Sequence, residues 1–225
     1  MRHLKCIVVL MWKDILLEVK TREMLSTMVI FSILVIFIFN FVMEPGTRYI
    51  KEIAPGILWI AFVFAGVLGL TRSFLMEKNK DCLRGLLLCP VNPTAIYGGK
   101  MLSNFLFISI VEAITLVVFF VLFNFPLIRL LPQLALVIFL GNVGFVAVGT
   151  LFSAMSLNTR AREIMLPILL FSIIIPVIII AVKLTGYILA LKSWSELVSG
   201  LKLLVAFDII FLTLSIMTFE YIIED

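Results

Sequence analysis

The sequence predicts an all-α, polytopic membrane protein with six transmembrane helices and an N-terminal amphipathic helix at the membrane surface. Hydrophobic residues make up 63% of the chain and charged residues only 14%, against about 45–50% and about 25% in soluble domains. Such a chain has too little polar surface to cover a water-soluble globule. Since 225 residues also leave no room for a further soluble domain between the spans, we expect one membrane domain over 1–225.

Six apolar segments are long enough to cross a bilayer. A hydrocarbon core of about 30 Å needs about 20 helical residues, because backbone groups in lipid must be hydrogen bonded within the segment. The expected spans are approximately 24–43, 53–74, 101–123, 132–157, 164–182 and 201–219. The half-apolar stretch 183–200 is expected to form a separate re-entrant or interfacial helix, with Trp194 at headgroup level.

The distribution of basic residues predicts the orientation, since cytoplasmic loops collect Lys and Arg. With the N-terminus inside, twelve of the 18 basic residues fall on the cytoplasmic side and six outside. We therefore expect both termini in the cytoplasm. The net charge of +4 then reflects topology and gives no reason to expect a nucleic-acid partner.

Residues 1–22 have the spacing of an interfacial helix. One side carries the apolar residues Leu4, Ile7, Val8, Met11, Ile15 and Val19. The opposite side carries Arg2, Lys13 and Lys20, while Glu18 interrupts the apolar side. We expect this helix to lie along the cytoplasmic headgroups, either as an anchor or as an element that transmits motion.

The chain lacks the signatures of metal sites and of nucleotide hydrolysis. Its single histidine, His3, excludes a His-based metal cage or a bis-histidine haem site, and Cys82 and Cys89 are too far apart for a Cys-x-x-Cys motif. No glycine loop ends in Lys-Ser or Lys-Thr, so this chain should not hydrolyse ATP itself. We expect no catalytic residues, no metal ligands and no intrinsic cofactor.

Three polar residues inside the predicted spans are candidates for a polar pathway, namely Glu112, Asn142 and Asp208. A carboxylate at the bilayer centre costs at least about 2.5–3.5 kcal/mol, so neither carboxyl group should face lipid. The three residues either line a polar pathway through the bundle or form hydrogen bonds between helices. Small residues indicate where helices pack closely: Ala61, Ala65 and Gly69 in the second span, and Gly141, Gly144 and Ala147 in the fourth.

The segment 77–100 is the best indicator of function. It is charged, partly amphipathic, interrupted by Pro90 and Pro93, and expected on the cytoplasmic side. It suits a surface on which another protein acts. The alternative is a solvated connector whose basic residues follow from topology alone.

The residues from 53 to 100 resemble the haem exporter protein B family. The resemblance rests on the runs Ile53-Ala54-Pro55-Gly56-Ile57-Leu58-Trp59-Ile60-Ala61-Phe62, Leu70-Thr71-Arg72-Ser73-Phe74, Gly85-Leu86-Leu87-Leu88-Cys89-Pro90-Val91 and Ile96-Tyr97-Gly98-Gly99-Lys100. Beyond these runs the similarity consists of length and six-span architecture, which permeases of the ABC-2 type share.

The resemblance implies the permease subunit of an ABC transporter complex for cytochrome c maturation in the bacterial inner membrane. The implied partners are a cytoplasmic ATPase that binds ATP, haem-handling and small accessory membrane subunits, and a second permease copy. Haem would be a transient substrate, and no haem-contacting residue is carried over. The alternatives are a generic ABC-2 exporter of lipid or drug, and a membrane scaffold that drives release of a haem-loaded chaperone.

With such an ATPase as partner, the segment 77–100 becomes a coupling loop. Leu83, Leu86 and Leu87 would be apolar anchors in a groove of the ATPase. Glu77, Asp81 and Arg84 would orient the contact by charge.

Overall fold

The computed structural model describes residues 2–43, 48–79, 92–124, 127–156 and 162–224. These residues form seven helices and contain no strand. The helices are α1 Arg2–Thr21, α2 Glu23–Val42, α3 Arg48–Asn79, α5 Pro93–Phe123, α6 Leu127–Met155, α7 Arg162–Leu189 and α8 Trp194–Glu224. The all-α prediction is confirmed.

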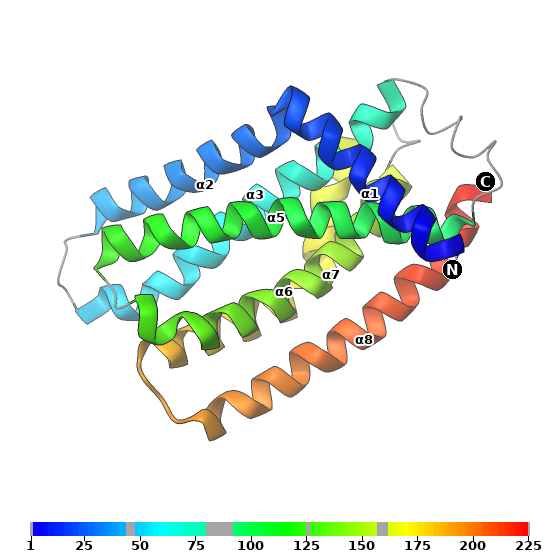
Figure 1. Cartoon of the computed structure of the whole chain (residues 1–225). Coiled ribbons are helices and arrows are strands. Elements are labelled where there is room, and N and C mark those ends of the chain that lie inside the picture. Colours follow the sequence, from blue (N-terminus) through cyan, green and yellow to red (C-terminus); the bar gives the residue numbers. More distant parts are fainter. Residues whose placement is uncertain (1, 44–47, 80–91, 125–126, 157–161, 225) are drawn as a thin grey trace.

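Six helices are long and apolar enough to cross a membrane, as predicted. The candidate spans are Glu23–Val42, Glu52–Ser73, Pro93–Phe123, Leu130–Met155, Ile164–Leu189 and Trp194–Tyr221. They run roughly along one direction of the bundle, with α1 lying across the outside of α5 (Figure 1). The start of α1 and the end of α8 lie at the same end of the bundle, as an even number of spans requires (Figure 1).

The third span begins earlier than the sequence suggested. The side-chain oxygen of Asn92 accepts a hydrogen bond from the Thr94 amide at 3.0 Å, and Pro93 occupies the first helical turn. This is the usual chemistry of a helix N-terminus. Residues 93–100, expected in the loop, therefore form the first turns of α5.

The separate helix expected within 183–200 is not formed, and that prediction was wrong. α7 continues to Leu189 and α8 starts at Trp194, with only a tight turn between them. Leu191 takes the left-handed conformation in this turn, at φ 56°. The apolar residues of the stretch instead extend the packed faces of the two spans, where Ile188 and Leu197 are buried.

The predicted small residues allow α6 to approach its neighbours. A Cβ atom added at Gly141 would lie 2.5 Å from the Trp59 ring of α3, and one added at Gly144 would lie 3.0 Å from the Phe207 ring of α8. The Trp59 indole also donates a hydrogen bond to Thr185 Oγ1 at 2.9 Å, which joins α3 to α7. Glycine at these positions is thus a packing requirement.

α1 has two apolar faces, which differs from the single face predicted. Its inner face, with Ile7 and Leu10, packs against α5. Its outer face exposes Val8, Val9, Trp12, Leu16 and Val19. Val8 and Val19 were expected on the same side as Ile7 but lie on the outer face. The outer face has the composition of a surface that enters the membrane interface.

Adding one methyl group to Gly141 is expected to destabilise the bundle. Gly141→Ala forces the Trp59 ring to move, at a cost of about 1–3 kcal/mol. Gly56→Ala is the matched control, because nothing lies within 4 Å of a Cβ atom at that position of α3. Thermal unfolding in detergent should show a lower Tm for Gly141→Ala only. Equal Tm values for the two variants would contradict the packing assigned to Gly141.

Candidate functional site

The two helix ends that flank the predicted docking segment lie at the end of the bundle that holds the start of α1 and the end of α8 (Figure 1). Glu77 belongs to the last turn of α3, which ends at Asn79, and α5 begins at Pro93 at the same end. The other five predicted docking residues are outside the described residues: Asp81, Leu83, Arg84, Leu86 and Leu87. Docking on this segment stays a prediction.

Two of the three polar residues predicted inside the spans meet in the bundle. The Asn142 side-chain amide of α6 donates hydrogen bonds to Glu112 Oε2 at 3.1 Å and to Ser109 Oγ at 2.9 Å, both on α5. Glu112 is 5% exposed and Asn142 is 2% exposed. This contact joins α5 to α6 away from lipid, as interhelical polar contacts in membranes do.

A small cavity of about 10 Å³ lies beside this polar pair. It has room for about one water molecule. Glu112 and Asn142 form its polar part, and the remaining lining is Trp59, Phe62, Val63, Gly141, Phe145, Ile174, Val177 and Ile178. Asn142 Oδ1 has no hydrogen-bond partner among the described residues. Any cargo larger than water would require α3, α5, α6 and α7 to separate here.

Asp208 lies apart from this pair, on the other side of α6. Its Oδ1 atom would be 2.6 Å from a Cβ atom at Gly144, so the carboxyl group of α8 rests on the glycine backbone of α6. Both of its oxygens are buried, and neither accepts a side-chain hydrogen bond within the described part of the chain. The predicted polar group of three therefore consists of one bonded pair and one separate carboxyl group.

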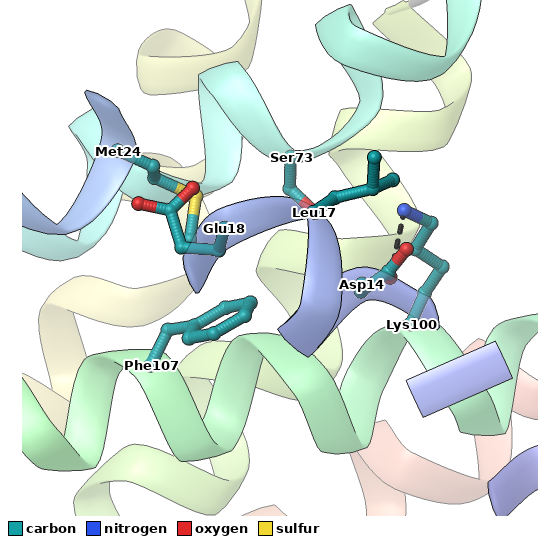
Figure 2. A pocket seen from close by; sticks show the side chains of 7 residues that line it. All are labelled: Asp14, Leu17, Glu18, Met24, Ser73, Lys100 and Phe107. Carbon is teal, nitrogen blue, oxygen red and sulfur yellow. Dashed lines mark ion pairs between the residues drawn. The ribbon is translucent and has the colours of Figure 1, made fainter. Parts of the chain in front are cut away.

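A buried ion pair between α1 and α5 was not predicted. Lys100 Nζ lies 2.9 Å from Asp14 Oδ2 (Figure 2). The Ser103 hydroxyl donates to the same oxygen at 3.0 Å. Asp14 is 8% exposed and Lys100 is 4% exposed. In the sequence these two residues look like ordinary charges of a membrane surface. The sequence feature that could have indicated a polar contact on this side of α1 is the spacing of Asp14 and Glu18, which lie four residues apart and so share a helix face.

Glu18 is also buried, although the sequence suggested that it merely interrupts an apolar face. Its Oε1 accepts a hydrogen bond from the Leu25 amide at 2.8 Å, in the first turn of α2. Between the two helices Arg22 turns the chain with φ 56°. A cavity of about 30 Å³ lies at this junction, lined by Asp14, Leu17, Glu18, Met24, Ser73, Lys100 and Phe107 (Figure 2).

Comparison with known proteins covers nearly the whole chain. A family model described as CcmB protein matches residues 5–224. Three bacterial proteins named Heme exporter protein B are similar to the chain. The one from Pseudomonas aeruginosa is 24% identical over 161 residues, which cover 72% of this chain and 71% of that protein. The one from Rhodobacter capsulatus is 23% identical over 175 residues, covering 78% and 80%.

The third relative, from Haemophilus influenzae, is 26% identical over 164 residues, which cover 72% of each chain. The resemblance noted over 53–100 thus extends through all the helices described above. The identities are low, but the family match includes the six spans and most of α1. The chain belongs to the CcmB family.

Proposed function

We propose that this chain is the permease subunit of an ABC transporter complex that exports or delivers haem for the biogenesis of c-type cytochromes. The observation that carries the proposal is the family match over residues 5–224, which includes all six candidate spans. The names of the relatives support haem as the cargo. The positive charges at the end of the bundle that holds the start of α1 support an inner membrane protein with both termini in the cytoplasm.

The energy for transport would come from a separate cytoplasmic ATPase. The chain has no phosphate-binding loop, and α3 ends and α5 begins at the proposed cytoplasmic end. From this end, α3 and α5 span the full length of the bundle (Figure 1). A displacement applied there would therefore tilt α3 and α5. Both helices line the cavity beside the Glu112–Asn142 pair, α3 with Trp59 and α5 with Glu112. Haem-handling and small accessory membrane subunits would complete the complex.

A complex with two ATPase sites calls for two permease copies related by a two-fold axis. α2 and α7 both carry long exposed apolar faces, which suits either lipid or a second copy. Exposed residues on these faces include Ile30, Leu34, Phe41, Ile168 and Ile175.

The small central cavity favours a second candidate function. With space for about one water molecule, the cavity beside Glu112 and Asn142 does not accommodate haem in the conformation described. A scaffold that uses ATPase motion to release a haem-loaded chaperone needs no such route. Haem reaching the periplasm in a strain without this protein would favour the scaffold over the exporter. Accumulation of a lipid or drug in that strain would instead favour a generic exporter.

Changing Leu86 to aspartate is expected to abolish association with the ATPase, because a charge replaces a predicted apolar anchor. Co-purification of the ATPase with the tagged permease in detergent measures the effect. Leu191→Asp is the matched control, since Leu191 is exposed in the turn at the opposite end of the bundle. An undiminished complex with Leu86→Asp would remove the support for docking at this segment.

Replacing Glu112 by glutamine is expected to preserve cytochrome c maturation. The glutamine carbonyl can accept the same hydrogen bond from Asn142 that the carboxyl group accepts now. Glu112→Leu cannot, and should lower the membrane abundance by weakening the α5–α6 contact by about 1–3 kcal/mol. Loss of maturation at normal abundance in Glu112→Gln would show instead that an ionised carboxylate is required.

A further inference from the structure

The motif Tyr97-Gly98-Gly99-Lys100 lies where α5 meets three other helices. Tyr97 is 1% exposed, and its hydroxyl donates to the Ala147 carbonyl of α6 at 3.0 Å. The centroid of its ring lies 5.1 Å from the ring centroid of Phe219, near the end of α8. Tyr97 therefore holds the first turns of α5 against both α6 and α8.

The two glycines of the motif bring α1 directly onto α5. A Cβ atom added at Gly98 would lie 3.3 Å from Ile7 Cδ1, and one added at Gly99 would lie 2.7 Å from Leu10 Cβ. Any larger residue at Gly99 would push α1 outward. The close approach brings the short side chain of Asp14 on α1 within reach of Lys100 and Ser103 on α5.

The lysine of the motif then locks the register of α1 on α5. Lys100 and Asp14 are both almost fully buried and lie 2.9 Å apart, with Ser103 as a second donor to Asp14. Lys13 Nζ also lies 3.3 Å from Asp14 Oδ1, but its side chain is 33% exposed. Burying a charge is costly, so replacing either Asp14 or Lys100 removes the buried contact between α1 and α5. A helix held only by the lipid surface would not form a buried ion pair with a neighbouring helix.

The same helix is joined to α2 at its other end. Glu18 accepts the hydrogen bond of the Leu25 amide across the turn at Arg22, so the start of α2 follows the end of α1. α1 thus bridges the first turns of α5 and the first turn of α2.

We propose that α1 and residues 93–104 of α5 move as one rigid unit, the coupling unit, which passes motion from the connection 80–92 to α2, α6 and α8. Asp14, Tyr97 and Lys100 are its positioning residues. This inference rests on the proposed function, in which an ATPase acts on the segment immediately before Pro93. Motion applied there would reach α6 and α8 through Tyr97, and α2 through α1.

The first experiment breaks and restores the ion pair. Asp14→Asn and Lys100→Met are each expected to reduce cytochrome c maturation to roughly a tenth or less, while the ATPase still co-purifies. The exchanged pair Asp14→Lys with Lys100→Asp is expected to recover a large part of this loss. Lys192→Met is the matched control, because Lys192 forms an exposed ion pair with Glu196 at the opposite end of the bundle.

Full maturation in both single variants would overturn the proposal. If the wild-type permease fails to co-purify with any ATPase, the proposed function fails, whereas the coupling unit is still judged by the single and exchanged variants. The two failures are therefore distinguishable.

A cross-link tests the rigid unit without touching the ion pair, in case the single variants do not fold. Ile7→Cys with Gly98→Cys suits a disulfide, since the nearest atoms to a Cβ at Gly98 are those of the Ile7 side chain, which the change removes. The background carries serine at Cys6, Cys82 and Cys89. After oxidation of the purified complex, ATPase activity should stay unchanged, because the bond joins parts that already move together. Activity lost on oxidation and regained on reduction would show that α1 slides on α5 and would overturn the proposal.

Discussion

The structure depends on the requirement that polar side chains of α5 find partners where lipid excludes water. Unpaired polar groups are costly in such an environment. Each partner lies on another helix, so satisfying these groups also fixes the helices around α5. The pairs are Tyr97 with Ala147, Lys100 with Asp14, Asn104 with Thr150, Glu112 with Asn142, and Thr115 with Ser32. α5 consequently organises contacts to α1, α2 and α6 along its whole length.

This arrangement explains which features were predictable. Apolar length alone specifies a span, so the six helices and their order followed from the sequence. The boundaries were less accurate because they depend on local chemistry, such as the cap formed by Asn92, and on apolar faces that continue past Leu189. α1 was correctly predicted as a helix, but its two apolar faces were predicted as one, because periodicity cannot separate them when a buried carboxylate such as Glu18 lies between them.

The candidate site was harder to predict than the fold, because its contacts join residues far apart in the chain. Glu112 was recognised as costly in lipid and Asn142 as a candidate for an interhelical hydrogen bond, but the spacing of residues within one helix says nothing about a partner on another helix. Asp14 and Lys100 were not recognised at all, since each looks like an ordinary interfacial charge. Asp208 was grouped with the polar pair on chemistry alone, and its position against Gly144 depends on how α8 packs on α6.

In the proposed mechanism, ATP acts on this chain through the coupling unit. Spin labels on exposed positions of the purified complex test it most directly, by measuring distances with and without ATP. Val9 of α1 and Leu102 of α5 are exposed on the unit, and Leu191 is exposed at the opposite end. We expect the Val9–Leu102 distance to stay constant on ATP binding while the Val9–Leu191 distance changes. A change in Val9–Leu102, or no change in either distance, would contradict it.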